Sequence, residues 1–479
     1  MMSIVSKSIL ILRKAAALML LPLLAWSCQL VTDDFDDETA NISNATQYIN
    51  ITISVSASES PFTRAKEPKG GEEGDGREKG IETRENEVEG VTVIFYRNAN
   101  GINATDAAST TIDFVAYYPT VLDDDYTPRT GTHYPDEVYY TTGEQELNEA
   151  LDATANYHLL VVANADLTNQ ITTSSTLANV RNMVYNMALY DGNVTNASKF
   201  IMTSSDDNEL TFNSYIDDKD RNRRTFQFDN IHIERLAARI DYCTEGATYD
   251  TDKNGYSYQV GSSSDVFVVT KVTPFNLYNE PEYLFKRVQN AWSGTITTTY
   301  LGDETTDNTN IANNYVVDPN TAQKDASHTF TYLSPIAETM STDYAQMMNS
   351  DQNKNRANQN IIIAYARENT LMPTSPLKKY ATGLAFEGYY YVNGTGTPEK
   401  RVYYHYLRHQ GENEQGTAYQ AKRWADINET DACGTTPMNY GIVRNNIYRV
   451  KISGITDDGL NLNIKVKKWD KFEHATIYM

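Results

Sequence analysis

The sequence predicts a mainly β protein built from two β-sandwich domains in tandem, with a few short helices. The chain contains 34 tyrosines, and β-branched residues are plentiful, which favours strands over helices. Short apolar or alternating runs are separated by turn-forming clusters along most of the chain, as in β-sandwich proteins. A length of 479 residues exceeds what one compact core usually holds, so we expect two domains.

The clearest strand is expected at residues 48–58. Apolar residues alternate strictly with polar ones there, and Ile49, Ile51, Ile53 and Val55 point to one face. This pattern predicts an edge strand with one face buried and the other in water. Burial of three or four of these side chains stabilises the fold by roughly 6–12 kcal/mol at most, so the strand should form a substantial part of a sandwich core.

Further elements follow along the chain. Strands are predicted at residues 91–96, 157–164, 266–272, 388–392, 401–409, 447–455 and 460–469. Short helices are predicted at residues 142–153 and 175–190, where apolar residues recur at helical spacing. The basic cluster at residues 219–224 is expected to be a solvated turn. We place the domain boundary near it, which gives domains at residues 65–225 and 226–479.

The N-terminus indicates export. An apolar run at residues 15–26 follows two basic residues and is too short to span a bilayer, so residues 1–27 are predicted to be a signal peptide. The run ends just before Cys28, where a lipoprotein signal peptidase would cut and leave an acylated cysteine. A signal peptide without lipid is the alternative. Residues 28–64 then form a lipidated propeptide that carries the first strand, and its acidic start is either a sorting signal or a solvated spacer.

A charged linker follows the first strand. Residues 66–85 are rich in Gly, Glu, Lys and Arg and have almost nothing to bury, so we expect them to lack regular structure. Arg64, directly before Ala65, therefore lies beside a segment that an arginine-specific protease can reach. Arg77 and Arg84 are further candidates for cleavage. A plain flexible linker is the alternative interpretation.

Charge and composition exclude several functions. A formal net charge of -22 repels phosphate backbones and anionic lipid, so we expect no nucleic-acid partner. We find no catalytic constellation, and we expect neither an enzyme nor a cofactor. His405 and His409 lack further metal ligands, so packing or surface placement is expected. Residues 250–255 match the first half of a calcium loop, but Gly261 occupies the position of the closing acid, which favours a turn.

Two cysteines remain in the mature chain, Cys243 and Cys433. They could pair in an oxidising compartment, although two lone cysteines are more often buried thiols. Both alternatives stay open at this stage.

Five segments together carry a family resemblance. In chain order they are YHLLVVANA (residues 157–165), ERLAARI (234–240), YLFKRV (283–288), MNYGIVRNNIYRV (438–450) and IKVKKW (464–469). With the lipoprotein start, they show that the chain resembles the fimbrillins of Bacteroidetes, the lipoprotein-precursor pilins that build type V fimbriae. Within that family it is most similar to the shaft subunit of the short (minor) fimbriae of Porphyromonas.

The resemblance implies assembly by strand exchange. Each fimbrillin has two transthyretin-like β-sandwich domains and reaches the cell outer membrane as a lipoprotein, with acyl chains such as palmitate on a cysteine that corresponds to Cys28. An arginine-specific surface protease then removes the first strand, and the matching cut lies between Arg64 and Ala65. The groove left by Ile49, Ile51, Ile53 and Val55 is filled by a strand of another subunit. The partners implied are other copies of the chain and other fimbrial subunits, in a fimbrium that serves adhesion.

Two C-terminal stretches could donate the replacement strand. Leu460, Leu462, Ile464 and Val466 alternate with polar residues, and the tail at residues 472–479 contains Ile477. An ordinary core strand is the alternative for the first stretch. Two other functions remain open: a fimbrial anchor or tip lipoprotein that escapes cleavage, and a surface glycan-binding lipoprotein.

Overall fold

The computed structural model describes most of the chain. The described residues are 45–55, 85, 87–97, 108–124, 138–152, 155–186, 199–204, 208–211, 215–289, 298–300, 315–408, 419–434, 437–456 and 459–468. Residues 1–27, which are predicted to be a signal peptide, lie outside these ranges, as do Cys28, Arg64, Ala65 and Ile477, so the predictions for them stay predictions.

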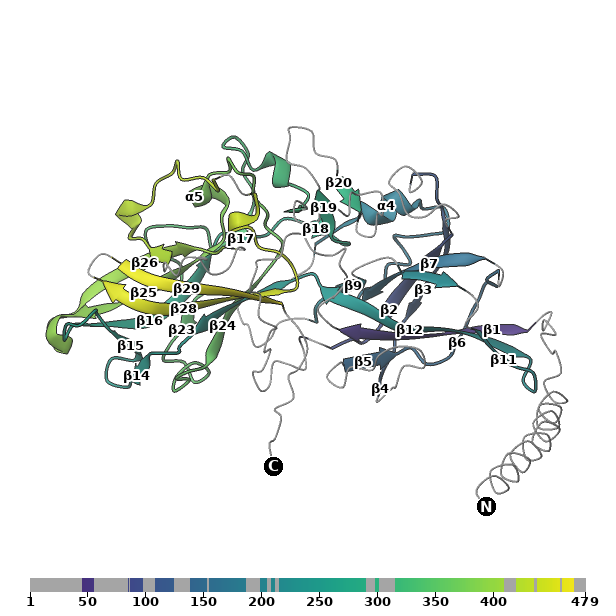
Figure 1. Cartoon of the computed structure of the whole chain (residues 1–479), viewed down its shortest axis with the longest axis horizontal. Helices are drawn as coiled ribbons and strands as arrows, with labels where there is room; N and C mark the ends of the chain where they lie inside the picture. Colours follow the sequence, from purple (N-terminus) through teal and green to yellow (C-terminus); the bar gives the residue numbers. More distant parts are fainter. Residues whose placement is uncertain are drawn as a thin grey trace, which may run out of the picture.

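The protein is mainly β, as the sequence predicts (Figure 1). An 11-stranded sheet occupies the N-terminal half. Its main path runs β3 (Ile112–Tyr118), β2 (Val91–Tyr96), β7 (Asn156–Ala163), β9 (Met202–Ser204), β12 (Arg223–Arg235), β1 (Thr46–Val55), β5 (Val138–Thr141) and β4 (Leu122–Asp124). Beside this path lie β10 (Asn208–Thr211), β11 (Tyr215–Asp218) and β6 (Gln145–Glu146). Buried residues of β1, β2, β7 and β12 belong to one hydrophobic core, so these strands enclose a common apolar interior.

Two sheets form a β-sandwich in the C-terminal half. The first has the order β24 (Asn360–Ala366), β13 (Ala238–Cys243), β28 (Asn446–Thr456), β29 (Gly459–Lys468) and β27 (Tyr419–Ala421). The second has the order β14 (Thr248–Asp250), β15 (Gly255–Gln259), β16 (Val266–Phe275), β25 (Gly383–Tyr391) and β26 (Glu399–Tyr406), with β23 (Gln346–Met347) paired to β16. Residues of both sheets, such as Tyr242 and Phe386, share a single core.

Smaller elements complete the described chain. Short strand pairs are β17 (Leu277–Tyr278) with β22 (Tyr332–Leu333), β18 (Glu282–Tyr283) with β8 (Val184–Tyr185), and β19 (Arg287–Gln289) with both β20 (Thr298–Tyr300) and β21 (Tyr315–Val316). The helices are α4 (Leu177–Arg181), α5 (Leu377–Tyr380), η4 (Thr321–Gln323), η5 (Val392–Gly394), η6 (Trp424–Asp426) and η7 (Pro437–Tyr440). In the part of the chain that the structure describes, no helix has the length and apolar character needed to cross a bilayer.

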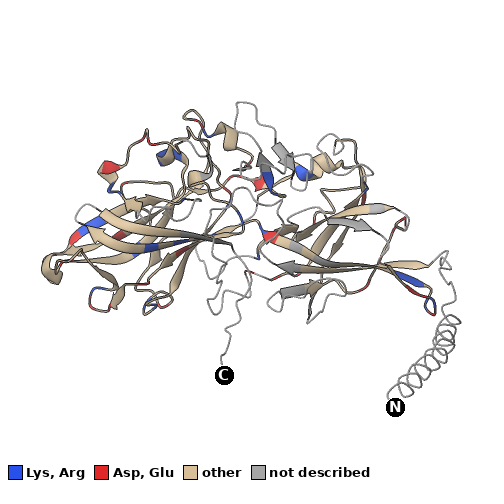
Figure 2. Ribbon diagram, in the orientation of Figure 1, with Lys and Arg blue, Asp and Glu red and all other residues tan. Residues whose placement is uncertain are grey.

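The two halves are joined by pairing and by buried polar contacts. β8 of the first half pairs with β18 of the second. The Nζ atom of Lys286 lies 2.7 Å from a carboxylate oxygen of Glu234, and both side chains are buried. Leu284 and Phe285 also belong to the core of the first half. Figure 2 shows basic and acidic residues distributed over both halves of the described ribbon rather than separated between them.

The predicted domain boundary needs a correction. The division after residue 225 falls inside β12, which stays in the first sheet as far as Arg235. The next strand, β13, begins the second half at Ala238. The basic cluster at residues 219–224 is a turn between β11 and the start of β12, so it marks the end of a hairpin and not the end of a domain.

The two predicted helices also need correction. Residues 142–152 form no helix, because β6 pairs with β1 there. Leu147 and Leu151 are nevertheless buried, so their spacing reflects a segment that folds against the core. Of the helix predicted at residues 175–190, the described residues 175–186 contain only α4. It starts at the N-cap Thr176, whose side chain accepts a hydrogen bond from the Asn179 N–H, and it ends at Arg181 ahead of the strand β8.

Candidate strand-exchange site

β1 lies inside the first sheet, between β12 on one side and β5 with β6 on the other (Figure 1). It runs parallel to β12, with Ile49 opposite Phe226. It runs antiparallel to β5, with Ile53 opposite Tyr140. The prediction of an edge strand is therefore wrong, since strands pair with both edges of β1. Alternation along a strand shows which face is buried and carries no information about hydrogen-bonded neighbours, which explains the error.

The apolar face of β1 is completely buried. Ile49, Ile51 and Ile53 are at most 1% exposed and belong to the core of the first half. Val55 is the last residue of β1, and its backbone pairs with both β12 and β5. Its side chain is not among those that the structure describes. At about 1.5–3 kcal/mol for each fully buried aliphatic side chain, the three isoleucines stabilise the fold by roughly 5–9 kcal/mol as an upper estimate.

The polar side chains of β1 organise the segment that follows β5. The amide of Gln47 donates to the carbonyl of Leu151 (3.0 Å) and accepts from its N–H (2.7 Å). The Thr142 hydroxyl accepts from the Ile51 N–H, and the Thr142 N–H donates to the Ile51 carbonyl, both at 3.0 Å. The guanidinium of Arg223 lies 3.9 Å from the ring centroid of Tyr48. The contacts of Gln47 and Ile51 tie Leu151 and Thr142 to β1.

β1 also holds part of the sheet in place. Within the described residues, β5 pairs only with β1 and β4, and β6 pairs only with β1. Removal of β1 would therefore uncover the backbone edge of β12 and remove the strand pairing that holds β5 and β6 in the sheet. An unpaired strand edge beside an exposed apolar surface readily binds another strand.

The chain that follows the charged linker is anchored at Glu85. Its carboxylate accepts hydrogen bonds from the Tyr365 hydroxyl (2.7 Å) and from Nη1 of Arg239 (3.1 and 3.2 Å). Its carbonyl accepts from Nε of Arg235 (2.9 Å), and the residue is 2% exposed. Burial alone lowers the pKa of Arg239, but the carboxylates of Asp241 and Glu85 raise it well above its ordinary value. This cluster is a charged and fully hydrogen-bonded clamp.

The sequence analysis missed the clamp. Glu85 and its partners Arg239 and Tyr365 are 154 and 280 residues apart along the chain. No local spacing rule connects residues at such separations. The only available signal was that Glu85 lies at the end of a charged linker, shortly before the buried strand β2.

One of the two candidate donor stretches is used in the subunit's own core. β29 pairs with β28 on one side and with β27 on the other. Leu460, Leu462 and Ile464 are fully buried, and Val466 pairs with Tyr448 through the backbone. The structure thus gives this stretch the role of a core strand in the monomer. The other candidate, the tail that contains Ile477, lies outside the described residues.

The remaining candidate residues have structural positions. His405 is buried in β26, whereas His409 lies outside the described residues. Residues 250–255 form the turn of the β14–β15 hairpin, in which Lys253 and Asp250 are an ion pair at 2.6 Å, so the predicted turn is confirmed. Cys243 and Cys433 are both buried free thiols, which settles the question of a disulfide between them.

Fold and site together define a class of β-sandwich protein. Its first strand lies within a sheet, and a long linker separates this strand from the next one in the sequence. Solved structures of fimbrial proteins are similar in fold. A fimbrilin, FimA, of Porphyromonas gingivalis matches with 11% identity and a TM-score of 0.40, covering 90% of this chain and 99% of its own. The tip fimbrial protein Mfa3 of the same organism matches with 9% identity and a TM-score of 0.40, covering 88% and 100%. A fimbrial assembly protein of Parabacteroides distasonis matches with 9% identity and a TM-score of 0.35, covering 87% and 98%.

Sequence comparisons add no relatives. No protein-family model matches the chain, and no curated protein matches it.

Proposed function

We propose that this chain is a structural subunit of a cell-surface fimbrium that polymerises by exchange of β1. The observation that carries the proposal is the position of β1. Its apolar residues Ile49, Ile51 and Ile53 are fully buried and the strand is paired on both sides, yet it is connected to the rest of its sheet only through the linker at residues 56–84. A single cut in that linker converts β1 into a separate peptide that is held by noncovalent contacts alone.

Cleavage changes which strand can occupy the place of β1 beside β12, which we call the slot. While β1 is attached, its effective concentration beside β12 is on the order of millimolar, which disfavours any strand from another molecule. After the cut, β1 can dissociate and dilute, and a strand tethered to a neighbouring subunit can replace it. Cys28 lies on the same side of the cut as β1. One cleavage would therefore open the slot and also release the subunit from its lipid anchor in the outer membrane.

The clamp at Glu85 discriminates among the candidate cleavage sites. To cut after Arg84, a protease must bind Glu85 and the residues after it in its own cleft. Glu85 is held by Arg239, Tyr365 and Arg235, so this bond requires local unfolding of the clamp. Arg64 and Arg77 lie at least eight residues before the clamp and need no such step. Cleavage after Arg64, with Ala65 as the new N-terminus, agrees with the resemblance stated above.

The tail is the better candidate for the donor strand. Donation of β29 would remove three buried aliphatic side chains from the subunit's own core, a loss of roughly 5–9 kcal/mol that the new site could at best return. In the tail, Ala475, Ile477 and Met479 alternate as a strand in the slot requires. We therefore assign donation to residues 472–479 and the role of shaft subunit to the chain.

The proposal is tested with an arginine-specific endoprotease, because Lys66, Lys69 and Lys79 would confuse a tryptic digest. Purified precursor is digested briefly, the new N-terminus is sequenced, and assembly is followed on a non-boiled gel. We expect an N-terminus at Ala65 and a ladder of polymers, and we expect a variant that carries both Arg64→Gln and Arg77→Gln to yield neither. Cleavage that leaves persistent monomers would count against a shaft role. Resistance at all three arginines would favour an anchor.

A further inference from the structure

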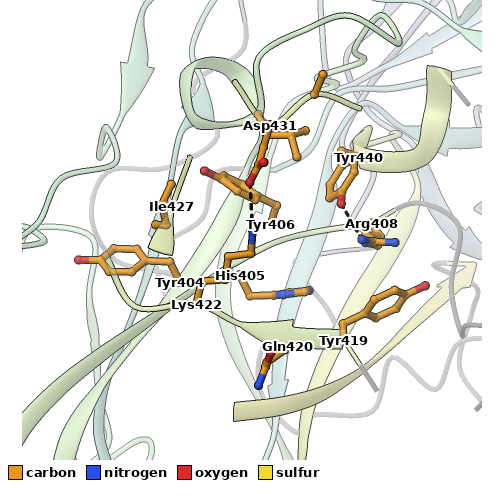
Figure 3. A pocket seen from close by; sticks show the side chains of 12 residues that line it. Tyr404, His405, Tyr406, Arg408, Tyr419, Gln420, Lys422, Ile427, Asp431 and Tyr440 are labelled. Carbon is orange, nitrogen blue, oxygen red and sulfur yellow. Dashed lines mark hydrogen bonds and ion pairs between the residues drawn. The ribbon is translucent and has the colours of Figure 1, made fainter. Parts of the chain in front are cut away.

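A pocket of about 300 Å³ lies in the C-terminal half, far along the chain from β1 (Figure 3). It is formed by the end of β26, the strand β27, the loop at residues 427–432 and the end of η7. Its size is at the lower end of the range for ligand pockets, which suits a ligand of one ring and not an extended chain. The polar side chains that line the pocket determine which kind of ligand it can bind.

Arg408 supplies a positive charge without a carboxylate partner among the described residues. Its guanidinium lies 4.2 Å from the ring centroid of Tyr419 and 4.7 Å from that of Tyr440. Its Nη2 donates to the Tyr440 hydroxyl (2.6 Å), whereas its Nε is buried with no hydrogen-bond partner. Figure 3 shows Tyr419 and Tyr440 on either side of this group. The two rings hold the guanidinium in a fixed orientation.

The other charges of the pocket cancel each other. Lys422 and Asp431 form an ion pair at 3.1 Å. With that pair neutral, Arg408 leaves the pocket one positive charge in excess, in a chain whose formal net charge is -22. An oriented cation with a free N–H is a typical receptor for a carboxylate.

Two further polar atoms at the pocket lack partners. His405 is 6% exposed, and its Nε2 has no hydrogen-bond partner. Burial, together with the positive charge of Arg408, lowers the pKa of His405 to about 3, so the ring is neutral. Since the ring hydrogen-bonds to the backbone of Gln420 through its other nitrogen, Nε2 is an acceptor. The buried hydroxyl of Tyr406 is likewise unpaired.

These three groups require different partners on one small molecule. Arg408 calls for a carboxylate, but a carboxylate has no proton to donate to Nε2 of His405. A hydroxyl can donate to His405, and another can pair with Tyr406. Buried polar groups in native proteins are nearly always hydrogen-bonded, so a polar ligand in this pocket would pair with atoms that the described protein groups leave unpaired.

We propose that the pocket binds one acidic sugar residue, with its carboxylate on Arg408 and ring hydroxyls on His405 and Tyr406. Uronic acids and sialic acids share this chemistry. The proposal is independent of strand exchange, because none of the three residues belongs to the first sheet or to the linker.

The test is calorimetric titration of the full precursor with glucuronate, N-acetylneuraminate, glucose and acetate. We expect at least one of the two acidic sugars to bind at least tenfold more tightly than both glucose and acetate. The sugar that binds shows whether the ligand is a uronic acid or a sialic acid. Equal binding of glucose, equal binding of acetate, or no binding of either acidic sugar up to 10 mM would overturn the proposal.

Variants localise the binding. Arg408→Gln should weaken the acidic sugar at least tenfold, and Tyr406→Phe, which keeps the ring, should weaken it severalfold. Arg401→Gln is the matched control, since Arg401 also lies over a tyrosine ring but pairs with Glu399 outside the pocket. It should leave the affinity unchanged, and an equal loss in this control would overturn the assignment. If Arg408→Gln fails to fold, the ligand panel and Tyr406→Phe still decide the question.

Discussion

Replacing Ile51 with alanine should destabilise the uncleaved precursor and leave the cleaved subunit unaffected. Ile51 is fully buried in the middle of β1, within the core of the first half. Truncation of a buried isoleucine to alanine costs about 2–5 kcal/mol, and the upper part of that range applies where the site cannot collapse. Here β12 and β5 flank the strand on both sides, so collapse is restricted. Once the cleaved β1 peptide has dissociated, residue 51 is no longer part of the subunit and the cost disappears.

The assay is guanidinium unfolding of precursor and cleaved subunit, each with and without the substitution. The matched control is Ile233→Ala on β12, because Ile233 is equally buried but remains in the subunit after cleavage. This control should lower the unfolding midpoint in both forms, whereas Ile51→Ala should lower it only in the precursor. An Ile51→Ala precursor as stable as the unsubstituted one, or an equal loss in both forms, would refute the reasoning.

Two other predictions rest on described contacts, and a third rests on the proposed donor tail. Glu85→Ala removes the clamp on Arg239 and Tyr365, so an arginine-specific protease should cut after Arg84 severalfold faster, as measured by mass spectrometry of the fragments; an unchanged rate would show that the clamp does not protect this bond. Burial raises the pKa of Glu282 from 4.5 to about 8, so the folded state binds an extra proton between these values and the stability this gives is lost as the pH rises towards 8. Glu282→Gln should flatten that dependence of the melting temperature between pH 5 and pH 8, and a slope equal to that of the unsubstituted protein would contradict the assignment. Deletion of Thr476–Met479 should reduce polymer formation on a non-boiled gel while leaving the melting temperature of the monomer unchanged, and normal polymer from this variant would exclude the tail as donor.

The sequence predicted where strands form more reliably than it predicted which strands pair with each other. The alternation of Ile49, Ile51 and Ile53 identified a half-buried strand, because side-chain burial on one face leaves a direct trace in the residue pattern. The pattern could not show that β1 lies between β12 and β5, since backbone hydrogen bonds involve every residue type equally. The segment at Leu147 and Leu151 was assigned to a helix for a related reason. Its apolar spacing is real, but contacts with Gln47 far away in sequence determine its backbone.

The candidate site was predictable only in part. Residues on β1 were found because their pattern is local, whereas the Glu85 clamp and the pocket around Arg408 depend on residues that meet only in the folded chain. For Leu460, Leu462 and Ile464, the sequence pattern is the same for a core strand and for a donor strand. Only their complete burial between β28 and β27 distinguishes the two roles in the monomer.

The proposed strand exchange determines which strand lies beside β12 in the assembled fimbrium. Cryo-electron microscopy of polymer grown from cleaved precursor would show that strand. We predict that residues 46–55 of the subunit are absent, and that residues 472–479 of a neighbouring subunit lie between β12 and β5. A polymer in which each subunit keeps its own Thr46–Val55 in that place would contradict the account.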